Sequence, residues 1–355
     1  MPRFPAEELL RLGTELFAAV GVPRPDAALV ADHLVEAGLL GHDSHSVLRF
    51  PQYVEMVRRG QVKVGAPLRV LKEAPRLAQV SGGWNFGPVT AAAAMELAIA
   101  KARGGAISAV TVKECNHVAR LGRFAAMAPA AGHLIAMVCA NGHGSDLAVA
   151  PHGGRERRLP TNPLAVAIPT SRDWPVVLDM TTSVTSGGAL RYYRNCGAPV
   201  PEGSIIDGQG HPTTDVEGYF GPPPGAMLPL GHPTAGHKGS GLAVVIDILA
   251  GALLGAGCSR ANAPATGNAL FIAVVEIEAF TAAAQFYAEV DGLIDWIKSS
   301  PPRPGFGEVM LPGENSHRIR TARSRDGLPV DETAWQQIAA LAAELRVSLP
   351  RPLAP

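Results

Sequence analysis

The sequence predicts an α/β (α+β) fold with a sizeable buried core, and three observations support this prediction. Hydrophobic residues make up 47% of the 355 residues and charged residues 17%, which is typical of globular rather than disordered chains. Apolar residues recur at helical spacing near both chain ends. Between residues 88 and 140, helical and strand-like segments alternate, as they do in layered arrangements of helices on a sheet.

The first 60 residues are predicted to form a small helical unit. Gly21 and Pro23 end the first helix. A second helix is expected over residues 26–40, because Pro25 and Asp26 are favoured at a helix start, and a third over residues 50–59. Five apolar residues lie on one face of the first helix, which is expected over residues 6–20: Leu9, Leu12, Leu16, Phe17 and Val20.

The middle of the chain alternates between strands and helices. Residues 68–80 mix strand-like apolar positions with charges, and an Ala-rich helix follows over residues 88–103, ended by Gly104 and Gly105. A strand over 107–112, a helix over 124–131 and a strand over 134–140 complete the alternation. Further strands are expected at 164–168, 176–179 and 269–275, and further helices at 241–256, 280–298 and 331–347.

Charge and composition exclude several classes of partner and location. Lys plus Arg equals Asp plus Glu at 31 each, which argues against nucleic acid or an anionic membrane as the main partner. The start of the chain lacks the apolar segment of a signal peptide, and the longest apolar stretch, 241–257, is too short and Gly-rich to span a bilayer. The four cysteines form no CxxC pair, and cytoplasm is the expected location.

The glycine-rich motifs do not include the common nucleotide-binding fingerprints. No GxGxxG follows a strand and opens a helix, and no GxxxxGK[ST] occurs. The most promising cluster is residues 236–241, where His237 and Lys238 stand in a Gly-flanked loop just before the expected 241–256 helix. Backbone N–H groups at a helix start attract anions, and a lysine adds a point charge for phosphate. The alternative is a tight turn with a surface lysine.

A second constellation occupies the loop at residues 41–49, between two expected helices. His45 can act as an acid or a base near neutral pH, and Ser44 can orient it or share its proton. Arg49, one helical turn further on, can hold a carboxylate with two parallel hydrogen bonds. The alternative is a helix cap followed by ordinary surface residues. His42 and His45 lack a third ligand at a suggestive spacing, so no metal site is predicted.

Polar residues also follow several of the expected strands. His117 and Asn141 come after the strands at 107–112 and 134–140, at the edge where ligands gather in α/β sheets. His117 is equally well explained as a hydrogen-bonded loop residue. Small polar groups suited to ribose or amide contacts occur at 161–163 and 179–183, and the segment 312–314 could bring a carboxylate to a site or merely reverse the chain.

Taken in order, these motifs resemble the malate/L-lactate dehydrogenase family of the non-Rossmann type. That family also includes ureidoglycolate, sulfolactate and diketogulonate oxidoreductases and the Δ1-piperideine-2-carboxylate reductases. The resemblance rests on DSHSVLRFPQYV (43–54), NHVARLG (116–122), TNPLAVAIP (161–169), LDMTTS (178–183), PEGSIIDGQGHPTTD (201–215), LPLGHPTAGHKGSGLA (228–243) and LPGE (311–314). Each motif is weak alone, but the ordered set is specific.

The resemblance implies a fold and an assembly. It implies a helical domain built from both chain ends, residues 1–75 with 310–355, and a mixed-sheet NAD(P)-binding domain of the non-Rossmann type over 76–309. It also implies a homodimer with the active site near the subunit interface.

The resemblance implies roles for particular residues. Ser44, His45 and His117 would be catalytic, and Arg49 would bind the substrate. The cofactor would be NAD or NADP, with NADPH slightly favoured because Arg172 and the basic residues at 155–158 are candidates for a 2′-phosphate. The residues expected to contact the cofactor are His117, Val118, Ala119, Arg120, Asn141, Thr161, Asn162, Asp179, Met180, Thr182, Ser183, His237, Lys238, Pro312, Gly313 and Glu314.

The chain departs from the family pattern at three positions. Ser46 replaces the usual Gly after Ser-His, Pro160 replaces the Gly before Thr-Asn-Pro, and Ala189 stands where the family commonly has Lys or, in the cyclic-imine reductases, Asp. The expected activity is hydride transfer between a nicotinamide and the α-carbon of a small 2-oxo or 2-hydroxy acid. The alternatives are reduction of cyclic 2-imino acids or N-alkyl imines, and a catalytically silent nucleotide-binding homologue.

Overall fold

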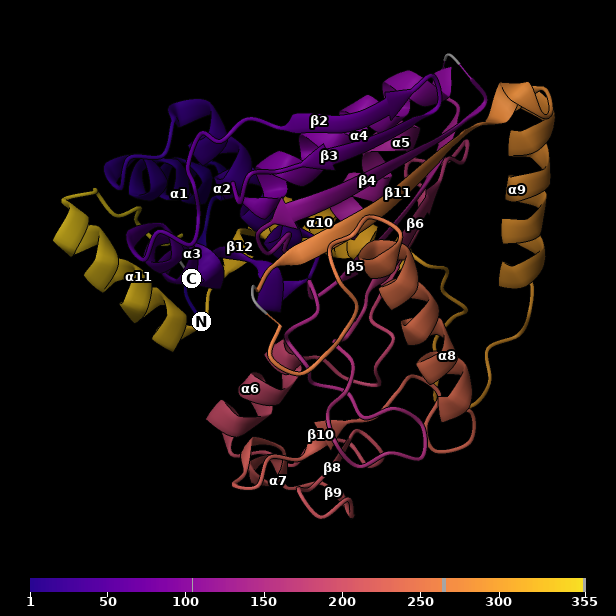
Figure 1. The fold of residues 1–355 in the computed structure, drawn as a ribbon. Coiled ribbons are helices and arrows are strands. Elements are labelled where there is room, and N and C mark those ends of the chain that lie inside the picture. Colours follow the sequence, from indigo (N-terminus) through magenta and orange to yellow (C-terminus); the bar gives the residue numbers. More distant parts are fainter. Residues whose placement is uncertain (104, 264–265, 354–355) are drawn as a thin grey trace.

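The computed structural model describes residues 1–103, 105–263 and 266–353. Figure 1 shows a twisted sheet backed by helices, with both chain ends together on one side of it. The main helices in this part of the chain are α1 (Ala6–Ala19), α2 (Arg24–Leu39), α3 (Phe50–Arg58), α4 (Gly87–Arg103), α5 (Gly122–Ala130), α6 (Gly187–Cys196), α7 (Val216–Phe220), α8 (Gly236–Asp247), α9 (Ala283–Lys298), α10 (Glu314–Asp326) and α11 (Glu332–Leu345). Shorter turns are η1 (Asp43–His45), η2 (Val47–Arg49), η3 (Ile248–Ala252) and η4 (Ile277–Ala279).

Within the described residues, seven strands form one mixed sheet in the order β2-β3-β4-β11-β5-β6-β7. Strands β3 and β4 are parallel, and every other neighbouring pair is antiparallel. The bounds of these strands are β2 (Arg69–Ala74), β3 (Leu77–Ser81), β4 (Ile107–Cys115), β5 (Leu134–Asn141), β6 (Leu164–Ile168), β7 (Val176–Met180) and β11 (Asn268–Glu276). The prediction of an α/β fold is therefore confirmed.

Two smaller sheets complete the strand inventory of the described residues. Strand β1 (Arg3–Phe4) pairs with β12 (Leu328–Pro329), and this pairing joins the two chain ends. Strands β8 (Ile205–Ile206), β9 (Pro212–Thr213) and β10 (Ala226–Met227) form a small sheet beside α6 and α7 at the foot of Figure 1.

The sheet has helices on both faces. Leu134, Ala136, Val138 and Ala140 of β5 belong to the apolar core that also contains α4 and α5. Successive side chains on a strand point to opposite faces. Asn141 therefore points to the other face, where its amide donates to Asp247 of α8 (3.0 Å).

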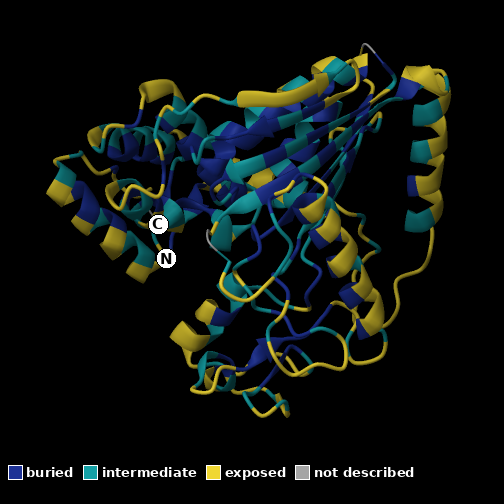
Figure 2. Ribbon diagram, viewed as in Figure 1, coloured by how far each residue is buried: buried dark blue, intermediate teal, exposed yellow. Residues whose placement is uncertain are grey.

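A separate apolar core lies between the two chain ends. It combines α1, α2 and α3 with β12 and α11, and its residues include Phe4, Phe17, Phe50, Leu328 and Ile338. Figure 2 shows this region and the sheet as the most deeply buried parts, whereas α9 is largely exposed. No helix in the described part of the chain combines the length and apolarity needed to cross a membrane.

Most predicted boundaries agree with the structure to within a few residues, but two expectations are wrong. The helix expected at 241–256 begins at Gly236, so His237 and Lys238 lie in its first turn and not in a preceding loop. The regular α-helix ends at Asp247, earlier than expected, and η3 (Ile248–Ala252) follows it as a π-helical turn. Helices α6 and α10 were not anticipated. Gly104, expected to help end α4, lies outside the described residues.

Candidate active site

The loop after α2 holds Ser44 and His45 in a short 3₁₀ turn, η1. The Ser44 Oγ lies 3.0 Å from His45 Nδ1, so the two side chains share a hydrogen bond. Arg49 closes the loop, because its Nε donates to the Ser44 carbonyl (2.8 Å). The segment that looked like a catalytic motif in the sequence is therefore a compact unit in the structure.

His117 stands on the loop that follows β4. Asn116 fixes this loop, because its side-chain amide donates to the carbonyls of Trp84 (2.6 Å) and Asn85 (3.1 Å). The start of α4 packs against the same loop: a Cβ on Gly87 would lie 2.2 Å from the His117 carbonyl oxygen. Only glycine fits there, so the close approach of α4 helps to hold His117 in place.

The structure brings His45 and His117 together from loops more than 70 residues apart. Their rings stack with centroids 5.8 Å apart and planes inclined by 12°. Tyr53, on α3, holds His117 from behind: its hydroxyl lies 3.0 Å from His117 Nδ1 and donates to the His117 carbonyl (3.1 Å). Because a phenol has one proton, both contacts are satisfied when Nδ1–H donates to the Tyr53 oxygen. His117 then keeps Nε2 as a free proton acceptor.

Burial and neighbouring cations make both histidines poor proton carriers in the free protein. Burial, with the charges of Arg49, His42 and Arg191, lowers the pKa of His45 to about 3. Burial, with Arg49, His45 and Arg191, lowers the pKa of His117 well below its usual value. Both rings are therefore neutral at neutral pH, ready to accept a proton.

Arg49 retains donors for a substrate. Its Nε is used by the Ser44 carbonyl, and its Nη1 donates to Gln52 Oε1 (2.5 Å). A guanidinium carries five N–H donors. The Nη2 group and the second N–H of Nη1 are therefore available to a carboxylate approaching the distal end of the fork.

Asp179 connects the loop after His117 to the end of β7. Its Oδ2 accepts from the Gly122 N–H (2.9 Å) and lies 3.4 Å from Arg120 Nε. The backbone N–H of Arg120 donates to His33 Nε2 (3.2 Å), and Val118 N–H donates to Asn268 Oδ1 (3.0 Å). The predicted segment that includes Ala119 is thus fixed by a buried polar network.

The small polar residues predicted near the cofactor lie together. Thr182 donates through both its backbone N–H and its Oγ1 to the Thr161 carbonyl (2.9 Å each), which places the end of β7, including Met180, beside Thr161. Ser183 Oγ donates to the Thr185 carbonyl (2.6 Å). Asn162 donates to the Ala243 carbonyl of α8 (2.9 Å), but its buried Oδ1 has no partner among the described residues.

Other predicted cofactor residues have structural roles. Both N–H groups of the Asn141 amide are used, by Asp247 (3.0 Å) and the Gly257 carbonyl (3.1 Å). The Pro312 carbonyl accepts from Val177 N–H at the edge of β7 (3.1 Å). Gly313, with φ of 93°, leads into α10, where the buried Glu314 carboxylate binds Lys298 (2.6 Å).

His237 and Lys238 are exposed in the first turn of α8. In the described chain, no hydrogen bond, ion pair or ring contact connects them to the histidine pair; His237 instead stands 5.7 Å from His152, ring centre to ring centre. The turn is shaped by Gly239, where a Cβ would meet the Leu230 carbonyl oxygen at 2.3 Å. A helix start with an exposed lysine remains a suitable anion site.

Two of the departures from the family pattern have a structural setting. Ser46 fits because α2 has glycine opposite it: a Cβ on Gly38 would lie 2.2 Å from Ser46 Oγ. Ala189 is the third residue of α6, and its N–H donates to the Ser186 capping hydroxyl (3.2 Å). The adjoining Gly188 packs on the loop at residues 41–49, because a Cβ on Gly188 would lie 2.6 Å from Ser44 Cβ. Position 189 therefore lies next to the residue through which α6 contacts the loop of Ser44 and His45.

Sequence reasoning missed Tyr53, and it raised Arg191 only as a possible substitute for the charged residue that the family carries at position 189. Tyr53 lies four positions after Arg49 on continuous helical turns, so its placement beside Arg49 could have been found from helical spacing. Arg191 has no comparable signal, because it belongs to a helix about 140 positions further along the chain that was not expected.

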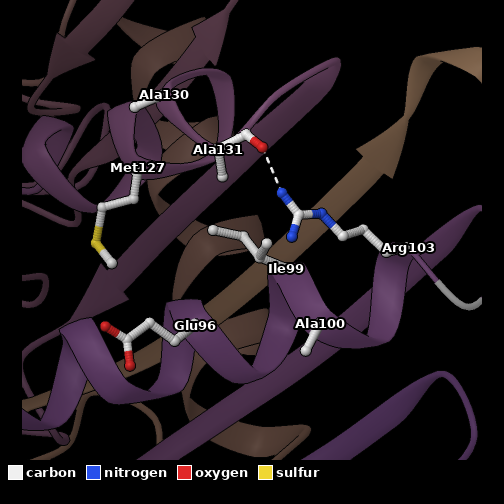
Figure 3. Close-up of a pocket in the computed structure, with 7 residues that line it drawn as sticks. All are labelled: Glu96, Ile99, Ala100, Arg103, Met127, Ala130 and Ala131. Carbon is white, nitrogen blue, oxygen red and sulfur yellow. Dashed lines mark hydrogen bonds between the residues drawn. The ribbon is translucent and has the colours of Figure 1, made fainter.

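A shallow hollow between α4 and α5 lies apart from this site. It has a volume of about 380 Å³ and is lined by apolar residues with Glu96 and Arg103, none of them a candidate site residue. Figure 3 shows Arg103 reaching across it to the Ala131 carbonyl. In the chain as described, no three His, Cys, Asp or Glu residues are grouped in a way that could hold a metal ion.

Comparison with known proteins identifies the family. Residues 4–339 match the malate/L-lactate dehydrogenase family. The malate dehydrogenase of Pyrococcus horikoshii is 37% identical over 352 residues, which cover 97% of this chain and 96% of that protein. The L-sulfolactate dehydrogenase of Methanothermobacter thermautotrophicus is 35% identical and covers 98% of both chains.

Solved structures agree with this result. The structure of malate dehydrogenase from Pyrococcus horikoshii superposes with a TM-score of 0.88 at 34% identity, covering 99% of this chain and 97% of that one. Sequence and fold therefore point the same way. The chain belongs to the malate/L-lactate dehydrogenase family and is an oxidoreductase.

Proposed function

We propose that this enzyme transfers a hydride between a nicotinamide cofactor and the α-carbon of a small 2-hydroxy or 2-oxo acid. The observation that carries the proposal is the stacked pair of neutral histidines, His45 and His117, beside the Arg49 guanidinium. Oxidation of a 2-hydroxy acid needs a proton acceptor at the hydroxyl and a cation at the carboxylate, and this site supplies both.

The residues present fit a dinucleotide. Asn162 Oδ1 is buried and has no hydrogen-bond partner among the described residues, so it can satisfy a polar group of a ligand. The α8 start offers backbone N–H groups and Lys238 for phosphate. When bound, the nicotinamide supplies or takes up the hydride.

We further propose that the enzyme prefers NADPH to NADH. Of the basic residues expected near a 2′-phosphate, Arg172 is paired with Asp295 and Arg158 with Glu156. Arg157 donates to the carbonyls of Gly225 and Tyr219. Arg155 is the remaining candidate from that group, and titration of the protein with both cofactors in a thermal-shift assay tests the preference.

The protein's own groups would divide the work as follows. Arg49 binds the substrate carboxylate and so fixes the α-carbon. In oxidation, Nε2 of His45 or His117 accepts the hydroxyl proton, while Ser44 and Tyr53 orient the two rings through Nδ1. In reduction, the bound substrate anion raises the pKa of the same histidines, because it offsets the cations that lower it, and the proton returns.

The proposal also includes an arrangement of domains and subunits. Two separate apolar cores support a helical domain of residues 1–75 with 310–355 and a cofactor domain of residues 76–309. A homodimer is supported by exposed apolar residues on α8, η3 and α9, such as Val245 (52% exposed), Ile248 (50%) and Trp296 (76%). Light scattering on the purified protein, with and without Trp296→Glu, tests the dimer.

Steady-state kinetics test the activity. NAD(P)H consumption should be measured with pyruvate and oxaloacetate, and separately with Δ1-piperideine-2-carboxylate and with pyruvate plus methylamine. Turnover of the oxo acids is expected to exceed that of the imines. His45→Ala and His117→Ala are expected to lower kcat by about 10²- to 10⁴-fold, whereas the exposed His133→Ala has no effect. Wild-type kcat in both active-site variants would overturn the proposal, and preferential turnover of the imines would replace its substrate class.

A further inference from the structure

Arg323, on α10, holds both ends of the short segment that joins α2 to the turn η1. Its Nη1 donates to the carbonyl of Gly38, near the end of α2 (2.5 Å). Its guanidinium also forms a two-pronged ion pair with the Asp43 carboxylate, with Nη2 3.1 Å from Oδ2. Asp43 is the first residue of η1, and Ser44 and His45 are the other two. A side chain from the C-terminal part of the chain is therefore bonded to the turn that carries His45.

The face of α10 that carries Arg323 also packs against this segment. Ile319 lies one helical turn before Arg323, and a Cβ on Gly41 would meet Ile319 Cδ1 at 2.8 Å. Gly41 has a φ of 85°, in the left-handed region that favours glycine. Leu328 of β12 makes a similar approach at Gly38, where a Cβ would lie 2.6 Å from Leu328 Cδ1. The two glycines thus let the C-terminal segment lie directly on the backbone between α2 and η1.

Helix α10 is fixed at both ends, whereas η1 is not stable by itself. At the start of α10, the buried Glu314 carboxylate binds Lys298 of α9 and Arg318 (2.6 Å each). After its end, β12 pairs with β1. A turn of three residues such as η1 has few hydrogen bonds of its own, and those of a 3₁₀ turn have poor geometry. The position of η1 therefore depends on contacts from a firmer element, and α10 provides them.

The surroundings of Arg323 argue for a role in geometry more than in stability. Its side chain is 17% exposed, but that of Asp43 is 58% exposed, and an ion pair with an exposed partner adds little to the free energy of unfolding. Arg325, two positions further on, differs from Arg323. It pairs with the adjacent Asp326, and both side chains are exposed, so this pair holds no other segment in place.

A displacement of Asp43 would be passed on to His45. The Asp43 carbonyl accepts from the Ser46 N–H (3.1 Å), and this bond closes the turn around His45. The His45 ring in turn lies parallel to that of His117, with 5.8 Å between the centroids. A shift of about 1 Å in a positioned catalytic group can cost about 100-fold in rate. The contact between Arg323 and Asp43 is therefore suited to controlling where His45 stands.

We infer that Arg323 is a positioning residue for His45: by holding Asp43 and the Gly38 carbonyl, it keeps η1 where His45 can exchange a proton with the substrate. The inference rests on the proposed function, since it concerns a histidine that the proposal makes catalytic. Arg323 acts on the proton-transfer group and not on the carboxylate that Arg49 binds. Its loss should therefore lower kcat and leave the KM of the substrate nearly unchanged.

The kinetic test compares wild type with Arg323→Met, Arg323→Lys and Arg325→Met. To exclude loss of folded protein, kcat is expressed per cofactor site, counted by fluorescence titration with NAD(P)H. Arg323→Met is expected to lower kcat by about 10- to 100-fold, to change the KM of the oxo acid by less than about threefold, and to raise the solvent deuterium isotope effect on kcat, because proton transfer becomes slower. Arg323→Lys keeps the charge without the fork and should have a kcat at least about threefold above that of Arg323→Met. Arg325→Met should match wild type.

A second substitution tests whether Arg323 acts through Asp43. Asp43→Ala should lower kcat at least about fivefold, and the double variant Arg323→Met with Asp43→Ala should be no slower than the slower single variant, because both changes break one contact. Losses that multiply in the double variant would overturn the inference. Asp43 is largely exposed, so Asp43→Ala and Arg323→Lys carry the test if Arg323→Met does not fold.

Amide hydrogen exchange separates failure of this inference from failure of the proposed function. In peptides covering residues 41–49, exchange should be at least about tenfold faster in Arg323→Met than in wild type, and unchanged in Arg325→Met. Faster exchange with a wild-type kcat would support the contact and contradict only the catalytic role of His45. Unchanged exchange at 41–49 would overturn the role of Arg323, whatever its kcat. A raised substrate KM with a wild-type kcat would overturn it too, and would assign Arg323 to substrate binding.

Discussion

The imidazole rings of His45 and His117 lie nearly parallel, with 5.8 Å between their centroids and 12° between their planes. Each ring has its Nδ1 engaged, by Ser44 and by Tyr53 respectively, so the two Nε2 atoms are the ones available for proton transfer. Burial and cations hold both rings in the neutral form.

The first prediction concerns the pH dependence of oxidation. Because the pKa of His45 is lowered to about 3, and that of His117 also lies well below its usual value, the base form persists in acid. kcat/KM for a 2-hydroxy acid is expected to show no loss from histidine protonation between pH 8 and pH 5. In the substrate complex the bound carboxylate raises these pKa values, so the acid limb of kcat should lie at higher pH than that of kcat/KM. An acid limb near pH 6.5 in the pH profile of kcat/KM would contradict the assignment of these histidines as the proton acceptors.

The second prediction concerns Tyr53. Tyr53→Phe removes the hydroxyl that binds both Nδ1 and the carbonyl of His117. We expect kcat to fall about tenfold with little change in KM, and the free energy of unfolding to fall by about 1–3 kcal/mol, because a buried carbonyl loses its donor. Kinetics and urea unfolding measure the two effects. Tyr287→Phe is the matched control, since it removes a similar Tyr–His contact (2.7 Å to His133 Nδ1) on the exposed surface; an equal effect on kcat in both variants would refute the role of Tyr53.

Acid stability provides a third prediction. Burial is the main cause that lowers the pKa of His33, His45 and His117 in the folded protein below the usual 6.5. As the pH falls, the unfolded chain therefore binds protons at these histidines before the folded chain does. The free energy of unfolding has its full value above about pH 6.5 and declines below it. Each such histidine costs about 1.4 kcal/mol of unfolding free energy per pH unit below that point.

Urea unfolding between pH 5 and pH 7 checks this expectation. His33→Gln removes one of these groups and keeps a side-chain acceptor for the Arg120 N–H, which His33 Nε2 accepts at 3.2 Å. Its stability should therefore decline less steeply with acid than that of wild type. His133→Gln, at an exposed position, should leave the slope unchanged. Identical slopes for His33→Gln and wild type would show that His33 does not take part.

The fourth prediction tests the anion site at the start of α8. Lys238→Ala is expected to raise the KM of the nicotinamide cofactor by about tenfold and to leave the KM of the substrate unchanged, because a phosphate loses one charged contact. Lys72→Ala, an exposed lysine on β2, is the control for a general change in surface charge. An unchanged cofactor KM in Lys238→Ala would remove this turn from the cofactor site.

The fifth prediction concerns Ala189. Ala189→Asp places a carboxylate in the first turn of α6, close to the loop that carries Ser44 and His45. The carboxylate should raise the pKa of His45 and stabilise the helix start by about 0.3–1 kcal/mol. The pH profile and urea unfolding measure these effects, with the neutral Ala189→Asn, isosteric with the Asp variant, as the comparison.

Local sequence signals predicted much of the fold. Helices α1 to α3 and strand β6 were predicted to within about two residues, because apolar periodicity and flanking Gly or Pro mark their ends. Helix α10 was missed because it is almost entirely polar and offers no apolar stripe to detect. The place of β11 between β4 and β5 could not be read from the sequence, since strand pairing depends on contacts between distant segments.

The candidate site likewise has a part that local sequence predicts and a part that depends on tertiary packing. Ser44, His45 and Arg49 are neighbours in the chain, and a short loop is enough to bring them together. The meeting of His45 with His117, and the approach of Arg191, depend on how α3, α4 and α6 pack. His237 and Lys238 were expected in a loop, because the three glycines at 236–241 are typical of a break, whereas both residues lie in the first turn of α8.

The insertion of β11 between β4 and β5 has a consequence for synthesis of the protein. Strands β4 and β5, between which β11 pairs, are synthesised more than 120 residues before β11. In a chain still growing on the ribosome, each of these two central strands therefore has one edge with unpaired N–H and C=O groups. The sheet can close only when residues 268–276 emerge, and the chain ends join later still, when β12 reaches β1. We therefore expect truncations before residue 268 to aggregate, and folding to be completed largely after translation.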